Sequence, residues 1–157
     1  VEIAVRNIAD GLVRVDPEGK AVYEKNRDRY IAEVNSTFRE LRDQLAPFKG
    51  TSVIQYHASW DYFCATFGLR VVGSLEPKPG IPPSSTHLQQ LINQLDLRPA
   101  RMVIRSAYQN ARASDWLSQR AGIPAVLLPS TVGGTEVASD LFGLFQDIVQ
   151  RLLEAAQ

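Results

Sequence analysis

The pattern of hydrophobic and polar positions along this chain changes near residue 50. Before that point, apolar residues recur at helical intervals among many charged ones. They predict one helix over residues 1–15 and, after the start signal Asp16–Pro17, a second amphipathic helix that ends at Pro47 and Gly50. The second helix would be roughly 30 residues long, well above the average for globular proteins. We therefore expect residues 1–49 to form a helical segment.

After residue 50, short apolar runs alternate with segments of helical period. Strands are predicted over residues 51–56, 69–75, 102–104 and 125–128, and helices follow them over residues 60–67, 84–95, 113–121 and 140–152. Such alternation is typical of a parallel sheet with right-handed crossovers. The fold class we expect is α/β, with a four-stranded, mainly parallel sheet, helices on both faces and a long backbone helix in front. Residues 50–157 would form the α/β lobe.

Composition narrows the classes of function. Lys and Arg together number 17, as do Asp and Glu, so there is no strong field to attract nucleic acid or anionic lipid. No stretch reaches the ~20 apolar residues that a membrane-spanning helix needs. The single cysteine, Cys64, cannot form an internal disulfide. These features indicate a globular protein that does not bind nucleic acid.

The strongest candidate for chemistry is His57, which follows the first strand of the lobe. Open α/β sheets place ligand groups at the carboxyl ends of their strands. At that edge an imidazole can be a metal ligand, a general base or a switch, or it can be an ordinary hydrogen-bonded histidine. His87 lies in the first turn of the next helix, and we interpret it as structural.

The residues of this chain do not complete a zinc site of the usual kinds. It has two histidines and one cysteine, without HxxxH or CxxC spacing. Carboxylates considered as additional ligands are Asp61, Glu76, Glu136 and Asp140. We expect Glu76, at the start of a proline-rich loop, to pair with a Lys or Arg, and Ser139 or Asp140 to cap the last helix.

A hydrolase or transferase is a rival interpretation, with His57 as base. The Gly133–Gly134 pair before the last helix could hold an anion on its backbone amides. The chain lacks the GxSxG elbow, the glycine spacing of a nucleotide fingerprint and the lysine of a P-loop. It contains no evident nucleophile, so this interpretation is the less favoured one.

Several motifs in sequence order resemble one known family. They are the helical NIADGL and DPEGKAVYEKNRDRYIAEV of the first segment, then YHASWDYF (residues 56–63), FGL (67–69) and EPKPGIPPS (76–84). Together they resemble the joining helix and carboxyl-terminal lobe of the zinc- and manganese-type solute-binding proteins of ABC transporters, the ZnuA-like or cluster A-I family. The resemblance covers nearly the whole chain.

The resemblance implies two α/β lobes that hold a metal between them and deliver it to a membrane permease. His57 stands at the position of a histidine ligand in zinc-type members, and the other histidine ligands would come from an amino-terminal lobe that this chain lacks. Many members place an aspartate after the last strand and another acidic residue after the third. Here those positions read Leu128–Pro129–Ser130 and Ile104–Arg105–Ser106, so that water or Glu136 supplies the further ligand, or binding is weaker.

We therefore expect a transition-metal receptor that is not an enzyme, with His57 as its metal ligand and zinc favoured over manganese. It would work outside the cytoplasm and meet the membrane through the permease, with any signal or anchor outside this chain. Its expected partners are the missing amino-terminal lobe and the permease, and the isolated lobe is expected to self-associate. The alternative is a receptor-like interaction module that has lost metal binding.

Overall fold

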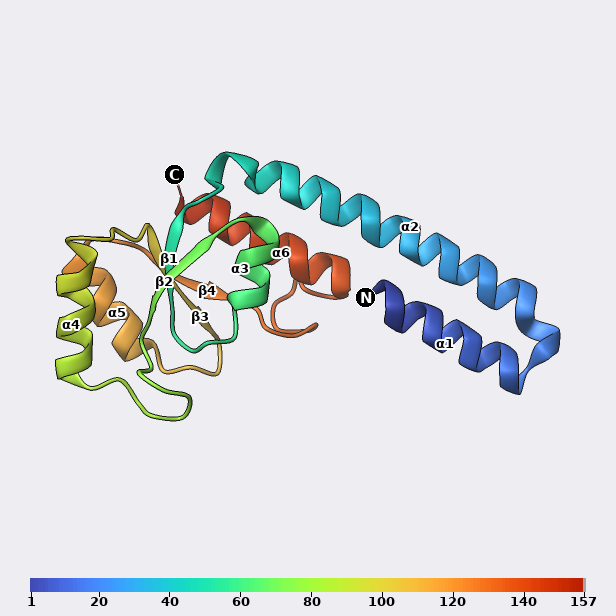
Figure 1. Cartoon of the computed structure of the whole chain (residues 1–157), viewed down its shortest axis with the longest axis horizontal. Coiled ribbons are helices and arrows are strands. Elements are labelled where there is room, and N and C mark those ends of the chain that lie inside the picture. Colours follow the sequence, from blue (N-terminus) through green and yellow to red (C-terminus); the bar gives the residue numbers. More distant parts are fainter. Residues whose placement is uncertain (157) are drawn as a thin grey trace. The chain divides into compact units, whose positions relative to one another are not determined.

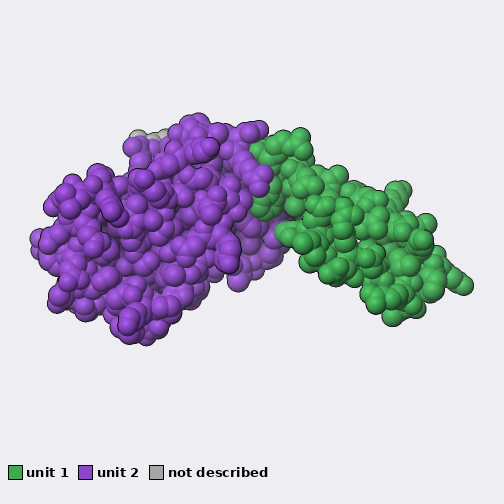
Figure 2. Space-filling model, in the orientation of Figure 1, with its two compact units in different colours: residues 1–40 green, residues 41–157 purple. Residues whose placement is uncertain are grey.

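The computed structural model describes residues 1–156, and its backbone divides into two compact units. Unit 1 comprises Val1–Glu40 and unit 2 comprises Leu41–Gln157 (Figure 2). The first is made of helices and the second contains the sheet (Figure 1).

Unit 1 contains the helix α1 (Glu2–Val15) and most of α2 (Lys20–Leu45), joined by a 3₁₀ turn over Pro17–Gly19. Asp16 caps this turn, since its Oδ1 accepts a hydrogen bond from Gly19 N at 3.3 Å. Its Oδ2 accepts another from the Tyr23 hydroxyl at 2.7 Å. The predicted start signal Asp16–Pro17 caps this 3₁₀ turn, and the α-helix itself begins at Lys20; the long second helix is confirmed, with 26 residues.

The last turn of α2 belongs to unit 2. Leu41 and Leu45 are 2% and 1% exposed, so this end of the helix is part of the core of the lobe. A 3₁₀ turn over Ala46–Phe48 follows, and Gly50, with φ of +84°, then directs the chain into the first strand.

The sheet of unit 2 has four strands, β1 (Ser52–Gln55), β2 (Arg70–Ser74), β3 (Met102–Ser106) and β4 (Ala125–Leu128). Their order is β2-β1-β3-β4 and every neighbouring pair is parallel. The helices α4 (Ser85–Leu95) and α5 (Ala111–Ala121) cover one face, and α3 (Asp61–Phe67) and α6 (Leu141–Ala155) cover the other (Figure 1). The expected fold class is confirmed, and the sheet is entirely parallel.

Burial of both faces explains the continuous apolar runs of the strands. Val53, Ile54, Val103 and Ile104 are all at most 1% exposed. On the face covered by α4 and α5, one cluster joins the sheet to the helices; its members are Ile54, Tyr56, Leu75, Leu88, Leu91, Ala100, Val103 and Leu117.

The pairing of β1 with β2 contains an irregularity that matters for the site. Ser52 lies opposite Arg70, an offset of 18 residues, but Ile54 lies opposite Gly73, an offset of 19. The β2 residue Val72 is the one that the register skips. Beyond the strand ends the later register continues, because Glu76 N donates to Tyr56 O at 3.0 Å.

No helix among residues 1–156 combines the length and the apolar character required to cross a lipid bilayer.

Candidate metal centre

His57 lies at the carboxyl edge of the sheet, directly after the last ladder bond of β1. Tyr56 N donates to Ile104 O at 2.9 Å, and the chain then turns, with Ser59 N donating to His57 O at 2.7 Å. The imidazole is 33% exposed. The ring therefore stands at the rim of the sheet, where the sequence places it, and is accessible from outside.

The ring of His57 is held by a carboxylate. Its Nδ1 lies 2.6 Å from Glu76 Oε2, and the Glu76 side chain is only 17% exposed. An ionised carboxylate can only accept hydrogen bonds, so in this pair Nδ1 carries the proton. The expectation that Glu76 pairs with a Lys or Arg is wrong. The register of β1 and β2 brings the carboxylate beside His57 instead of beside a basic residue.

The other nitrogen of the ring, Nε2, forms no hydrogen bond to any of the described residues. A neutral imidazole whose Nδ1 donates to a carboxylate presents its lone pair at Nε2, which is the usual arrangement of a metal-binding histidine. Within residues 1–156, however, no group of three His, Cys, Asp or Glu side chains is arranged to hold a metal ion. The geometry therefore suits His57 as one ligand of a metal but does not complete a coordination shell.

The remaining candidate carboxylates form no hydrogen bond or ion pair with His57 in the described structure. Asp61 accepts a hydrogen bond from Gln55 Nε2 at 2.9 Å. Asp140 caps α6, as expected, by accepting from Gly143 N at 2.7 Å. Glu136 is exposed on the loop before α6.

His87 has a structural position, as expected. Its Nε2 donates to Ser74 O at 2.9 Å, and its backbone N–H donates to Ser84 Oγ at 3.2 Å. The ring ties the first turn of α4 to the end of β2.

The loop that carries Gly133–Gly134 is not available as an anion cradle. Gly133 N donates to Ala138 O at 2.6 Å, and Gly134 N donates to Thr131 O at 3.0 Å. Both N–H groups are used within the loop, so the rival hydrolase interpretation loses its anion-binding element.

Gln55 is a supporting residue that the sequence did not reveal. It is 2% exposed at the end of β1, its Oε1 accepts from Trp60 N at 3.1 Å, and its Nε2 bonds Asp61. These bonds close the loop over residues 56–61 on which His57 is mounted. The only available signal was a polar residue within an apolar strand.

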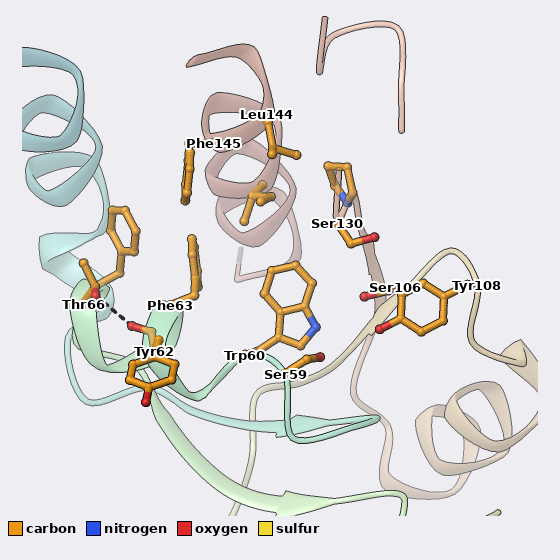
Figure 3. A pocket seen from close by; sticks show the side chains of 13 residues that line it. Ser59, Trp60, Tyr62, Phe63, Thr66, Ser106, Tyr108, Ser130, Leu144 and Phe145 are labelled. Atoms are coloured by element: carbon orange, nitrogen blue, oxygen red, sulfur yellow. Dashed lines mark hydrogen bonds between the residues drawn. The ribbon is translucent and has the colours of Figure 1, made fainter. Parts of the chain in front are cut away.

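A cavity of about 450 Å³ opens at the same edge of the sheet, between α3, α6 and the ends of β3 and β4 (Figure 3). Trp60, Phe63 and Phe145 form much of its wall, and Phe63 stacks on Phe145 with ring centroids 6.4 Å apart. Its described lining contains no histidine, cysteine or carboxylate. The cavity is therefore not itself a metal centre.

Comparison with known proteins places these features in context. A family model described as "Zinc-uptake complex component A periplasmic" matches residues 1–155. The high-affinity zinc uptake system protein ZnuA of Brucella abortus (strain 2308) is 32% identical over 94 residues, which is 60% of this chain and 28% of that protein. Its counterpart in Bacillus subtilis (strain 168) is 24% identical over 151 residues, 96% of this chain and 47% of that protein. The chain thus spans less than half the length of these relatives.

Solved structures agree on the fold. A crystal structure of ZnuA superposes with a TM-score of 0.79 at 26% identity, over 96% of this chain and 56% of that one. A manganese-bound variant of a periplasmic metal-binding protein from Candidatus Liberibacter asiaticus superposes with a TM-score of 0.78 over 99% of this chain and 60% of that one. At 14% identity, the second match supports the fold alone.

Proposed function

This chain belongs to the family of the periplasmic zinc-uptake component A, and from that premise we propose that it is part of a receptor that binds zinc for an ABC transporter. His57 is the proposed metal ligand, through Nε2. The observation that carries the proposal is the state of its ring, which is accessible at the sheet edge with Nδ1 bonded to Glu76 and Nε2 unpaired among the described residues. The family comprises transport receptors and is not a class of enzymes.

The proposal assigns the parts of the chain as follows. Residues 1–49 are the helical segment that joins two lobes, and residues 50–157 are the carboxyl-terminal lobe. The proposed partners are an amino-terminal lobe, which brings further ligands, and a permease in the membrane, so that the receptor works outside the cytoplasm. The ZnuA structure, of which this chain covers 56%, supports a second lobe. Self-association of the isolated lobe remains a further proposal.

Zinc is proposed over manganese on the chemistry of the donor. Imidazole nitrogen suits zinc, whereas manganese favours carboxylate and water oxygens. The end of β4, where Leu128 is followed by Pro129 and Ser130, offers no carboxylate. The names of the Brucella and Bacillus relatives, which are zinc uptake proteins, support the same choice.

The test is a zinc titration of the chain and of two histidine variants. Because one imidazole binds weakly by itself, the titration extends to millimolar zinc and is followed by the imidazole ¹⁵N signals. His57→Ala should weaken binding by more than roughly 10-fold, since it removes a ligand and not merely an outer-shell group. His87→Gln is the matched control, because Gln can still donate to Ser74 O, and it should bind as the unmodified chain does.

Equal zinc affinity of His57→Ala and the unmodified chain would remove His57 from the site. If neither the chain nor a two-lobed form that contains it bound zinc, the alternative of an interaction module without metal binding would be favoured. A manganese titration under the same conditions tests the metal preference, and tighter manganese binding would contradict the proposed order.

A further inference from the structure

We propose that Glu76 is a positioning residue, which sets the tautomer of His57 and thereby decides which ring nitrogen is offered to a metal. The tautomer follows from the geometry alone. Its consequence for metal binding rests on the function proposed above.

The contact between the two side chains defines the tautomer. Nδ1 and Oε2 are 2.6 Å apart, a distance at the short end of hydrogen bonds to ionised acceptors. If the proton were on Nε2, the lone pair of Nδ1 would face an acceptor oxygen with no proton between them. The carboxylate therefore favours the Nδ1–H tautomer, and the lone pair is then on Nε2, which has no hydrogen-bond partner among residues 1–156.

The carboxylate can impose this choice because its own position is fixed by the backbone. Glu76 N donates to Tyr56 O at 3.0 Å, which anchors the residue to the strand that precedes His57. Oε2 also accepts a bond from Gly80 N at 3.3 Å, so the proline-rich loop turns back onto the carboxylate. Ile81 N donates to Lys78 O at 3.0 Å, and Gly80 has φ of +79°, which closes this turn.

The same loop limits the freedom of the carboxylate. Pro79 lies within the turn, Pro77, Pro82 and Pro83 flank it, and each proline fixes its φ near −65°. Because the carboxylate is already held in place, little further conformational entropy is lost when the ring binds a ligand. This gives the EPKPGIPP segment a physical role: it holds one carboxylate oxygen against Nδ1.

The first arm of the test needs no metal. Long-range ¹H–¹⁵N NMR of the metal-free chain at alkaline pH distinguishes the two neutral tautomers of each histidine. His57 should show Nδ1 protonated. His87 is an internal reference of the opposite kind, because its Nε2 must carry the proton that it donates to Ser74 O.

Three variants of the loop complete this arm. Glu76→Gln should keep the Nδ1–H tautomer, because the amide oxygen can still accept, whereas Glu76→Ala should give a mixture. Lys78→Ala, an exposed change in the same loop, should leave His57 unchanged. Dispersion of the remaining amide signals shows whether Glu76→Ala is folded. If Glu76→Ala is not folded, the tautomer of His57 is compared between Glu76→Gln and the unmodified chain. Nε2–H in the unmodified chain, or an unchanged tautomer in a folded Glu76→Ala, would overturn the proposal.

The second arm measures zinc affinity on the same samples. Glu76→Ala should weaken binding by about 10–100-fold, the range seen when an outer-shell partner of a metal ligand is removed. Glu76→Gln should bind closer to the unmodified chain. If Glu76→Gln lost as much affinity as His57→Ala while keeping the Nδ1–H signal, the carboxylate would be a ligand itself, and the positioning role would be wrong.

The two arms separate this proposal from the proposed function. An Nδ1–H signal that depends on Glu76, with zinc affinity that does not depend on His57, would retain the positioning contact and reject the metal site. Zinc affinity that depends on His57 but is unchanged in Glu76→Ala would retain the metal site and reject the positioning role of Glu76.

Discussion

Gln55→Leu should destabilise unit 2 through the loop that carries His57. Leucine has nearly the volume of glutamine but can neither accept from Trp60 N nor donate to Asp61 Oδ1, the two bonds that Gln55 makes at 3.1 and 2.9 Å. Trp60 is 6% exposed, so its backbone N–H would be left without an acceptor in a buried position. A buried, unsatisfied donor costs about 1–3 kcal/mol.

The second bond contributes less. Asp61 is exposed, and water can replace Gln55 as its donor, so we assign its loss less than about 1 kcal/mol. Burying the apolar leucine offsets part of the cost. The free energy of unfolding should therefore fall by about 2 kcal/mol in Gln55→Leu. Asp61→Asn, which keeps an oxygen acceptor for Gln55, should cost less than about 0.5 kcal/mol.

Urea unfolding measures these differences directly. Trp60 and Trp116 both lie in unit 2, so their fluorescence reports on this unit. Gln89→Leu is the matched control, since Gln89 is exposed on α4 and its Nε2 donates to Asn93 Oδ1 on the helix surface. It should change the free energy of unfolding by less than about 0.5 kcal/mol. If Gln55→Leu were no less stable than this control at an equal m-value, the bracing role of Gln55 would be refuted.

Four further predictions concern single positions. Burial, with a smaller effect of the Asp61 charge, raises the pKa of the Cys64 thiol from 9.0 to about 12. The native chain should thus resist iodoacetamide until urea unfolds it. Because the thiol loses its proton more easily in the unfolded chain, the free energy of unfolding should decline as pH rises from about 9 towards 12. Cys64→Ala should lack this contribution to the decline. Gly122→Ala should destabilise unit 2 by about 1–2 kcal/mol in thermal melts, because φ is +66° there. Gly11→Ala should instead stabilise unit 1 by about 0.5–1 kcal/mol in the same melts, because Gly11 lies inside α1 and nothing lies within 4 Å of the added Cβ. Asp140→Ala should cost about 1 kcal/mol in urea unfolding through loss of the cap of α6, and an unchanged midpoint would contradict that role.

Much of the fold could be predicted because local signals agree with the tertiary structure. Asp16 starts its turn, and Gly68 and Gly122 end α3 and α5 in the left-handed conformation. The ends of helices and strands were harder to predict from the sequence. β3 runs on to Ser106, two residues beyond the predicted strand, because Arg105 and Ser106 pair with Leu127 and Leu128. Such pairing depends on the neighbouring strand and is invisible in local propensity.

The candidate site, too, could be predicted only in part. The place of His57 could be predicted, because a polar residue after a buried strand marks the carboxyl edge of a parallel sheet. Its partnership with Glu76 could not be predicted, although Glu76 follows the next strand closely and was considered as a ligand. Which side chain lies beside His57 depends on the register between β1 and β2, and that register cannot be read from the sequence.

The register itself depends on a single residue. With the offset of 18 residues that holds at Ser52 and Arg70, His57 would lie opposite Leu75. The shift to 19 between Val53 and Ile54 places Glu76 there instead, and a slip of one residue also exchanges the faces to which side chains point. Gly73 lies at the shift, where an added Cβ would come within 3.0 Å of Leu91 Cδ2. The contact between the imidazole and the carboxylate therefore depends on an irregularity at Val72 and Gly73, within β2, although Glu76 itself lies beyond the end of that strand.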